Sequence, residues 1–431
     1  MSYADRSSVA VLGVPFDNVS MDEALALLDE KINQDGFHQV ATANVDFLMH
    51  AIHDKELQEI LCSCDLVVPD GMPIVWAARM MGMRLKERVS GVDLVPRLAA
   101  LSAERGYGMY LLGASDQSSR RAAECLKESF PALRIVGRYS PPSTSLGEMD
   151  HEAILSRIER AKPDILLVAM GNPKQEKWLA MHRDRLRVPL CMGIGASLDF
   201  LAGTVSRAPL WMQNSGLEWL HRVCQEPARL TKRYLNDAAG LVRHLPPQVA
   251  VSATQPRKPS ASAIQVHDVG SALVIVIQGD LTPRLLRQFD THIRRASSDA
   301  RHVILDLART AYLGPNSLGT LVHLKTTMGR RRRQLWLADL PGHIHRVLRT
   351  ARLEHFFTIT PSVSDAIYRI EKAERLLPDE LDAMRSFGPA ARERVNVQLE
   401  LLQGLCERIG AVAGHVELNS GQFQARTSAA R

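Results

Sequence analysis

Up to about residue 245, short runs of apolar residues alternate with longer stretches in which apolar residues recur at helical spacing. The apolar runs have the length of strands and lie at residues 39–43, 66–68, 109–112, 135–136, 165–170 and 190–194. Parallel strands are joined by helical crossovers, so this alternation constrains the chain to an α/β fold. We predict a Rossmann-like, mostly parallel sheet covered by helices. Ser20 and Glu23 match a capping box and predict a helix from Met21 to Ile32.

The same pattern divides the chain into four regions. Residues 1–245 carry the alternation and are expected to form one domain. Residues 246–262 are rich in Pro, Ser, Ala and Gln, which predicts a linker. Residues 263–374 repeat the pattern on a smaller scale, with a helix expected at 283–296, and predict a second α/β domain. Residues 375–431 are expected to form a helical, partly disordered tail.

The composition of the 431 residues excludes several classes of protein. Hydrophobic residues make up 45% and charged residues 23%, as in ordinary globular proteins. No apolar run approaches the roughly 18 residues of a membrane-spanning helix, and the N-terminus lacks the apolar core of a signal peptide, so we expect a cytoplasmic protein. The six cysteines show no zinc-binding spacing and are expected to be reduced. The net charge of +6 favours an anionic partner, which could be a nucleotide, a nucleic acid or an anionic lipid.

Polar residues directly follow two of the predicted strands, and an α/β sheet binds its ligands at the carboxyl ends of its strands. Thr42 and Asn44 follow the first of these strands, where Asn44 could contact a ligand or cap the next helix. Asp70 follows the second strand and is held between Pro69 and Gly71. A carboxylate fixed in this way can act as a general base, although it could also be a helix N-cap.

Four further residues lie where a strand meets a helix. Arg88 could clamp a phosphate or carboxylate, or lie in a surface loop. Lys174, at the start of a helix, could bring a positive charge to a diphosphate. Gly195 permits the close approach of a ligand, and Asp199 offers an acceptor for ribose or uracil. The sequence has no HExxH, GxSxG or Asp-x-Asp motif, which disfavours a zinc protease, an α/β-hydrolase and an Asp-x-Asp metal-dependent sugar transferase. The charge of a nucleotide diphosphate would therefore need to be offset by something other than a metal ion held by an Asp-x-Asp pair.

Residues 204–245 interleave basic and aromatic side chains at amphipathic spacing. Such a stretch suits the headgroup region of an anionic membrane, and the alternative is a packed helix with a solvated basic face. The basic residues expected to contact the membrane or a lipid diphosphate are Arg222, Arg229, Lys232 and Arg233.

Taken together, these segments resemble the WecG/TagA/CpsF glycosyltransferases, glycosyltransferase family 26. The resemblance runs from about residue 9 to about residue 236, and Ala43 stands where the family usually has Pro. The motifs that carry it include TANVDFL, DLVVPDGMPIVWAAR, ERVSGVDL, GNPKQEKWLAMHR, GIGASLDFLAG and RAPLWMQNSGLEWLHR.

The resemblance implies an inverting transferase that needs neither metal nor cofactor. It would move an N-acetylmannosamine-type sugar from a UDP-sugar donor to a polyprenyl-diphosphate-linked acceptor in cell-surface polysaccharide synthesis. Asp70 and Thr42 would be the catalytic residues, with Asp70 as the general base. Thr42 would also line the sugar pocket, together with Asn44. Arg88 and Gln175 would contact the diphosphate or the acceptor. In this family the region corresponding to residues 207–243 closes over the site and docks on the membrane, which implies a peripheral protein on the inner face of the cell membrane.

The segments HVILDLARTAYLGPNSLGTLVHL and HRVLRTARLEHFFTIT in the second domain resemble a STAS domain. Regulatory STAS domains carry a phosphorylated serine in an Asp-Ser-Ser-Gly motif, whereas this chain has Gly314-Pro315-Asn316-Ser317 there. The resemblance implies a non-catalytic interaction module with a possible protein partner.

Two other functions compete with the transferase. A catalytically silent regulatory protein could sense a UDP-sugar and act through its STAS domain, although the presence of Thr42, Asp70, Arg88 and Gln175 argues against it. A nucleic-acid-binding protein would fit the positive charge, but the sequence contains no nucleic-acid-binding motif, so we expect no nucleic acid partner.

Overall fold

The computed structural model describes residues 7–255, 262–282, 285 and 302–373. The first domain is built on a six-stranded sheet of order β4-β3-β8-β7-β5-β6, in which every neighbouring pair is parallel. The strands are β3 (His38–Ala43), β4 (Leu66–Pro69), β5 (Gly108–Gly113), β6 (Arg134–Tyr139), β7 (Ile165–Ala169) and β8 (Leu190–Gly193). The predicted Rossmann-like parallel sheet is therefore confirmed, and each strand coincides with one of the apolar runs.

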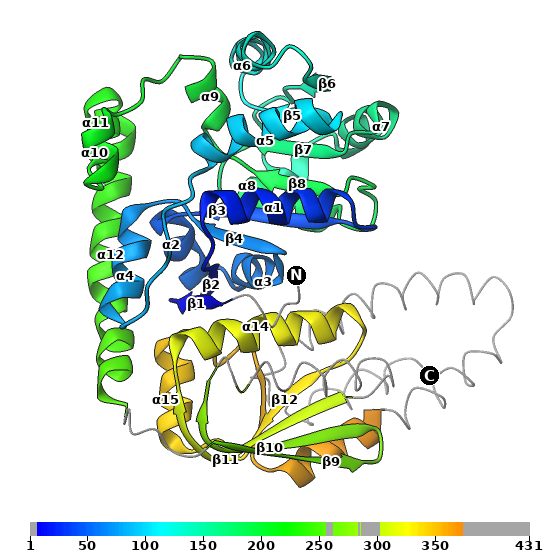
Figure 1. Cartoon of the computed structure of the whole chain (residues 1–431), viewed down its shortest axis with the longest axis vertical. Helices are drawn as coiled ribbons and strands as arrows, with labels where there is room; N and C mark the ends of the chain where they lie inside the picture. Colours follow the sequence, from blue (N-terminus) through cyan, green and yellow to red (C-terminus); the bar gives the residue numbers. More distant parts are fainter. Residues whose placement is uncertain (1–6, 256–261, 283–284, 286–301, 374–431) are drawn as a thin grey trace, which may run out of the picture.

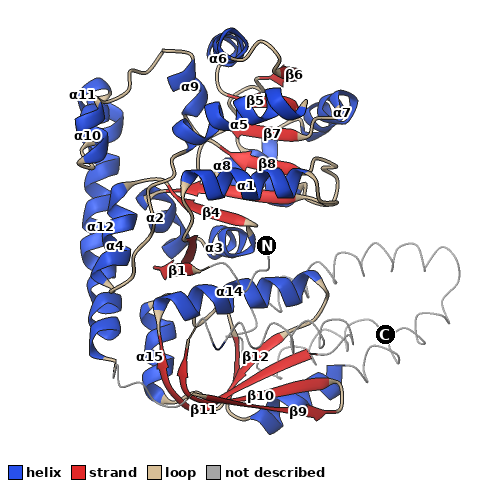
Figure 2. Ribbon diagram, in the orientation of Figure 1, coloured by secondary structure: helices blue, strands red, loops and turns tan. Residues whose placement is uncertain are grey.

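Helices cover both faces of this sheet, as Figure 2 shows. One face is covered by α1 (Met21–Ile32), α5 (Gly91–Arg105), α6 (Asp116–Ser129) and α9 (Ser197–Leu201). The other face is covered by α2 (Val45–His53), α3 (Lys55–Ser63), α4 (Met72–Met80), α7 (His151–Ala161) and α8 (Lys174–Met181). Successive strand residues point to opposite faces, so Val40 packs under the first group and Ala41 under the second. The predicted capping box of α1 is present, with both Ser20 and Glu23 hydrogen bonds formed.

An antiparallel hairpin, which the sequence pattern did not predict, precedes the sheet. It consists of β1 (Ser8–Val11) and β2 (Val14–Asp17), and its two turn residues Leu12 and Gly13 both have positive φ angles. The Asp17 carboxylate accepts a hydrogen bond of 2.8 Å from the backbone N–H of Val67 in β4. The hairpin therefore supports the edge strand of the main sheet.

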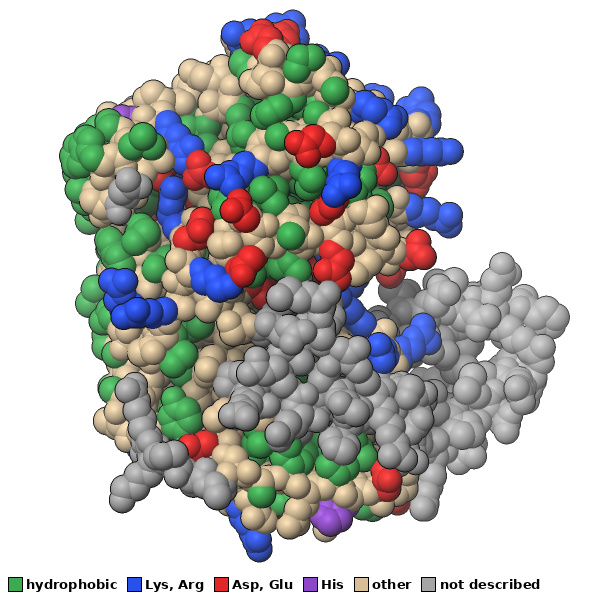
Figure 3. All heavy atoms as spheres, viewed as in Figure 1, with side chains coloured by type: hydrophobic (Ala, Val, Ile, Leu, Met, Phe, Trp, Pro, Cys, Tyr) green, Lys and Arg blue, Asp and Glu red, His purple; other side chains and the backbone are tan. Residues whose placement is uncertain are grey.

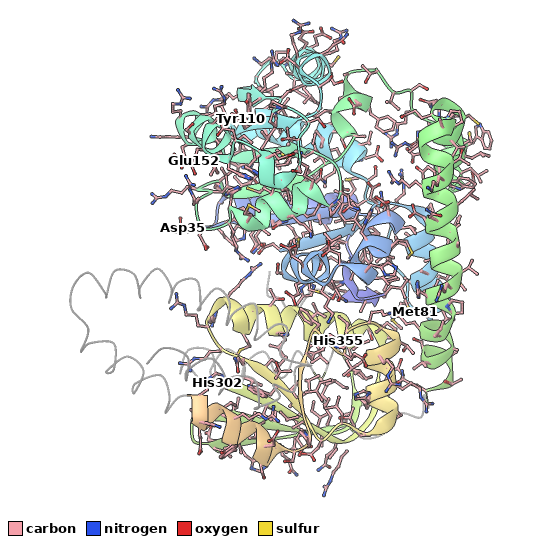
Figure 4. The ribbon with its side chains drawn as sticks, turned by 180° about the vertical axis from the view of Figure 1, so that it is seen from behind. Asp35, Met81, Tyr110, Glu152, His302 and His355 are labelled. Atoms are coloured by element: carbon pink, nitrogen blue, oxygen red, sulfur yellow. The ribbon has the colours of Figure 1, made fainter. Side chains whose placement is uncertain are left out.

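Three helices close the first domain and form an arm along one side of it, at the left of Figure 1. They are α10 (Leu210–Asn214), α11 (Glu218–Gln225) and α12 (Pro227–Thr254). The sequence predicted a linker from residue 246, and this prediction is wrong for its first part, because α12 continues through Pro246 and Pro247. The buried Gln248 side chain explains the difference, since it accepts from Leu12 N at 3.0 Å and donates to Ala10 O at 2.8 Å. Met81 lies beside α12 in the view from behind (Figure 4), and it belongs to the same buried cluster as Leu245 of that helix.

The second domain contains a five-stranded sheet of order β13-β12-β11-β10-β9, in which only the β9–β10 pair is antiparallel. The predicted helix at 283–296, apart from Leu285, and the predicted tail at 375–431 lie outside the described residues. A further helix spans residues 363–373. The other elements are β9 (Ala263–Val269), β10 (Ala272–Leu281), β11 (His302–Leu313), β12 (Leu335–Ala338), β13 (Thr358–Thr360), α14 (Pro315–Arg330) and α15 (Gly342–Thr350).

The two domains pack directly on one another, with α14 lying against β1 and α3 (Figure 1). Ala10 and Cys62 of the first domain belong to the same buried apolar cluster as Leu318 and Leu321 of α14. No helix in the described residues is both long enough and apolar enough to cross a bilayer.

The role of Gln248 in fixing α12 can be tested by Gln248→Ala. The variant leaves the buried Leu12 N–H and Ala10 carbonyl without their partner, so we expect the free energy of unfolding to fall by about 2–3 kcal/mol in chemical denaturation. Gln117→Ala, at an exposed position of α6, is the control and should change it by less than about 0.5 kcal/mol. An equal effect of both variants would contradict this role.

Candidate active site

A cavity of about 350 Å³ lies between the carboxyl ends of β3 and β4 and the arm formed by α10, α11 and α12. Its position is the one expected for a ligand site in an open parallel sheet. The polar and aromatic side chains that line it include Asn44, Asp46, Asp70, Arg88, Phe200, Gln213, Glu218, Trp219, Arg222, Arg233, Tyr234 and Asp237.

Asp70 is fixed at the end of β4 by its backbone. Its N–H donates to Ala43 O at 2.9 Å, while the preceding carbonyl of Pro69 accepts from Val89 N at 3.0 Å. The next residue, Gly71, has a φ of +153°, a conformation that L side chains rarely adopt, and this turn directs the chain into α4. These backbone contacts place Asp70 at the cavity wall.

Burial raises the pKa of the Asp70 carboxyl to about 6. The positive charges of Arg88 and Arg222 oppose this rise, the negative charge of Glu218 adds to it, and the backbone N–H of Gly91 stabilises the carboxylate. A carboxyl group with this pKa is ionised at neutral pH and still accepts a proton readily, as a general base requires.

Arg88 is the centre of an ion-pair network that joins the loop between α4 and α5 to the arm. Its guanidinium lies 3.0 Å from Glu218 Oε2 in α11 and 3.2 Å from Asp93 Oδ2 in α5. Asp93 also pairs with Arg207 at 2.6 Å and accepts from Ser90 Oγ at 2.6 Å. These contacts lower the pKa of Asp93, although its burial acts in the opposite direction. The network therefore anchors α11 over the cavity.

A second group of charges lies on the wall formed by α2 and α12. Arg233 Nε lies 3.3 Å from Asp46 Oδ1 and 3.8 Å from Asp237 Oδ2. Burial, together with the nearby charge of Asp46, raises the pKa of Asp237 to about 6, and Arg233 opposes the rise. Asn172 donates to Asp46 Oδ2 at 3.2 Å, which connects the loop after β7 to this wall.

Of the two polar residues predicted after β3, only Asn44 is among the residues that line the cavity. Its side chain also caps α2 by accepting from Phe47 N at 3.4 Å, so the two readings of the sequence are compatible. Thr42 is buried within the sheet, and its hydroxyl donates to Gly193 O of β8 at 3.3 Å.

The four residues predicted after β7 and β8 lie outside the cavity lining. The buried Gln175 side chain accepts from Gly171 N at 3.2 Å and from Gly195 N at 3.1 Å, which ties the two strand-end loops together. Its amide also donates to the buried Glu176 carboxyl, whose pKa burial raises to about 8. The Lys174 ammonium donates to the carbonyl of Thr144. Asp199 is half-buried in α9, one residue before the cavity-lining Phe200.

Two of the four basic residues predicted in the arm line the cavity. Arg222 places its guanidinium 5.3 Å from the centre of the Phe200 ring and, among the described residues, has no carboxylate within ion-pairing distance. Arg233 is the other and pairs with Asp46 as described above. Lys232 is exposed and is not among the residues that line the cavity, and the side chain of Arg229 lies outside the described part of the structure.

Sequence reasoning gave no role to Glu218, Tyr234 or Asp237. Glu218 lies 130 residues from its partner Arg88, so no local pattern connects them. The cavity-lining residues of α12 do show a helical spacing that could have been recognised, because Tyr234, Asp237 and Leu241 are three and four positions apart. Within the described ranges, no cluster of three or more His, Cys, Asp or Glu side chains could hold a metal ion.

Comparisons with known proteins agree with this architecture. Residues 9–252 match the model of the glycosyl transferase WecG/TagA/CpsF family, and residues 264–361 match the model of the Mlab STAS domain. An N-acetylglucosaminyldiphosphoundecaprenol N-acetyl-β-D-mannosaminyltransferase of Bacillus subtilis (strain 168) is 29% identical over 217 residues, which are 50% of this chain and 83% of that protein. The protein of the same name from Staphylococcus aureus (strain MRSA252) is 27% identical over 227 residues, which are 52% and 87% of the two chains.

These matches define the protein as a glycosyltransferase by class. The family model covers more than half of the chain, so the chain belongs to the WecG/TagA/CpsF glycosyltransferase family, and the resemblance found in the sequence is confirmed. Among solved structures, the unphosphorylated anti-sigma factor antagonist SpoIIAA is similar to 25% of this chain and to 98% of its own, with 16% identity and a TM-score of 0.22.

The electrostatic arrangement around Asp70 predicts the effect of Glu218→Gln. Removing the Glu218 charge removes one cause of the raised pKa and also frees Arg88 from a competing carboxylate, so the pKa of Asp70 should fall below about 6. The pKa can be measured by carbon NMR of protein labelled at aspartate carboxyls, with Asp70→Asn identifying the signal. Glu87→Gln, at an exposed position next to Arg88, is the control and should leave it unchanged. An unchanged or higher pKa in Glu218→Gln would contradict this arrangement.

Proposed function

We propose that this protein transfers an N-acetylmannosamine-type sugar from a UDP-sugar to a polyprenyl-diphosphate-linked acceptor, with Asp70 as the general base. The observation that carries the proposal is the half-buried Asp70 carboxyl, whose pKa is about 6, at the wall of a cavity that also presents Arg88 and Arg222. The names of the Bacillus and Staphylococcus relatives supply the sugar and the lipid-linked acceptor. This activity belongs to the synthesis of cell-surface polysaccharide.

The reaction is a displacement at the anomeric carbon of the donor sugar. Asp70 accepts the proton of the acceptor hydroxyl, the hydroxyl oxygen bonds to the anomeric carbon, and the bond from that carbon to the diphosphate breaks with its electron pair leaving on UDP. Attack from the face opposite the diphosphate inverts the configuration. Arg222 and Arg88 offset the charge that develops on the leaving diphosphate, as fixed cations do in a partly dehydrated site.

The remaining predicted residues support the site in different ways. Asn44 contacts the sugar from the cavity wall while it caps α2. Thr42 and Gln175 form hydrogen bonds with the backbone. Thr42 joins β3 to β8, and Gln175 fixes the loops after β7 and β8. Gly195 lies in the second of these loops, and Lys174 and Asp199 lie in the helices that follow the two loops. We assign these three residues to the nucleoside end of the donor.

The acceptor enters the cavity from the membrane. Figure 3 shows hydrophobic side chains gathered along the arm at the left of the molecule. The exposed apolar residues of α4, α10, α11 and α12 are Trp76, Met80, Leu210, Trp211, Trp219, Leu220, Leu235 and Val242. Trp219 and Leu235 belong to this apolar patch and also line the cavity, so the cavity opens onto the patch. With exposed Lys232 beside it, the patch suits the inner, anionic face of the cell membrane.

Asp70→Asn tests the role of the base. The amide cannot accept the proton, so transfer should fall by ~10²-fold or more while binding of the UDP-sugar is kept. In the wild type the rate should rise with pH through about 6, because Asp70 is protonated below that value and ionised above it. Transfer can be followed as UDP release, and Asp116→Asn, on the exposed first turn of α6, is the matched control. Turnover of Asp70→Asn close to that of the wild type would remove the role of the base.

The membrane role of the arm is tested by the double variant Leu210→Ser, Trp211→Ser. Both side chains are more than 60% exposed and neither lines the cavity, so binding to vesicles with anionic lipid should weaken about tenfold or more. Transfer to a short, water-soluble acceptor should be retained. Met181→Ser removes an exposed apolar side chain outside the patch and should leave vesicle binding unchanged. Unchanged vesicle binding by the double variant would show that the patch does not dock on lipid.

A further inference from the structure

The second domain faces the first domain through α14, and this contact is close along its length. A Cβ atom at Gly319 would lie 2.3 Å from Ser8 Oγ and 2.7 Å from Ser8 O, so α14 can approach the hairpin only with glycine at this position. Thr326 donates to Cys62 O at 3.0 Å, and Gln58 of α3 donates to Arg352 O at 2.7 Å. The interface is therefore continuous with the core of both domains.

Arg330, at the end of α14, reaches a buried carboxylate of the first domain. Its guanidinium makes two hydrogen bonds to Asp65, of 2.7 and 3.0 Å, and a third of 2.8 Å to Ser63 O. Asp65 is 1% exposed, and the contacts from Arg330 and His38 lower its pKa despite its burial. Asp65 also accepts from Gln39 N at 3.1 Å, and it directly precedes β4. One carboxylate thus links the second domain to the starts of β3 and β4.

A second contact with a buried carboxylate lies about two turns further back along α14. His323 is buried, and its Nε2 lies 3.3 Å from Oδ1 of the buried Asp17. The other oxygen of Asp17 accepts from Val67 N, in the middle of β4. Asp65, which directly precedes β4, and Asp17, which binds the backbone within β4, are therefore both in contact with α14.

The position of β4 makes these contacts relevant to the site. It is an edge strand of four residues, paired with β3 alone among the strands of its sheet, and Asp70 follows its last residue. A short strand with one paired edge needs other contacts to fix it. The surface of α14 is also unsuited to a phosphorylation switch, because Ser317 is fully buried and its hydroxyl donates to Leu281 O.

We propose that the partner of the STAS domain is the first domain of the same chain, and that Arg330 and His323 are positioning residues that fix β4 and thereby Asp70. This inference rests on the proposed function only in taking Asp70 as the reacting group. The STAS domain then acts as a built-in support for the edge strand of the transferase, in place of the external protein partner expected from the sequence.

The test compares full-length Arg330→Ala with Arg331→Ala, which removes the same charge from the adjacent exposed position. Hydrogen exchange should become faster in Arg330→Ala at the backbone amides within residues 66–70, which are those of every residue except Pro69, with exchange in β7 unchanged. The kcat for transfer should fall about tenfold while the KM for the UDP-sugar stays within twofold, because Asp70 acts in the chemical step and the residues assigned to the donor lie outside β4. Arg330→Lys keeps the charge and should restore part of kcat, and Arg331→Ala should resemble the wild type.

Several results would overturn the inference. They are unchanged exchange at 66–70 in a folded Arg330→Ala, faster exchange there with unchanged kcat, or equally faster exchange throughout the first domain. If Arg330→Ala does not fold, Arg330→Lys carries the test, and wild-type exchange and kcat in that variant would count against the proposal. If the wild type itself shows no transfer, the proposed function fails, and exchange at 66–70 alone decides whether α14 supports β4.

Discussion

The ion-pair network around Arg88 holds together the two walls of the candidate active-site cavity. The cavity has the strand ends on one side and the arm on the other, and Arg88 lies between Asp93 and Glu218, with Arg207 on the far side of Asp93. Two cations and two carboxylates, each partly shielded from water, join segments that are up to 130 residues apart in sequence. Such pairs are costly to break because one lost partner leaves a shielded charge uncompensated. The network both closes the cavity and sets the field in which Asp70 titrates.

The site combines two requirements that usually conflict. A base and its cations work best when water is partly excluded, but a lipid-linked acceptor has to enter from a bilayer. The arm satisfies both, because one face of α11 and α12 presents Glu218, Arg222 and Asp237 to the cavity while Trp219 and Leu235 reach its rim and solvent. The support for β4 comes from the opposite side of the sheet edge, through the hairpin and α14. Asp70 thus follows a strand that is supported from one side, and the arm encloses its cavity from the other.

Much of the fold could be predicted from the sequence because the six strands of the first sheet are short apolar segments between amphipathic helices. Asp70 and Asn44 could also be placed together, since β3 and β4 are neighbours and their carboxyl ends meet at one edge. Other features depend on contacts that no local pattern shows. Gln175 looked suited to a ligand, yet its amide is committed to two backbone N–H groups. Pro246 and Pro247 looked like the start of a linker, yet Gln248 holds α12 against the hairpin. The joining of the two domains through Asp65 and Arg330 spans 265 residues and has no sequence signature.

The central claim is that the cavity brings donor and acceptor together for transfer at Asp70 with cationic side chains as the counter-charge. The most direct measurement is UDP release by the purified protein given UDP-N-acetylmannosamine and a short-chain polyprenyl-diphosphate-N-acetylglucosamine, each alone and both together, with and without EDTA. We expect UDP release only when both substrates are present, at the same rate with and without EDTA. The amount of UDP released should equal the amount of glycosylated lipid formed. Binding of UDP-sugars without transfer to any acceptor would contradict it and would identify a sugar-nucleotide sensor instead.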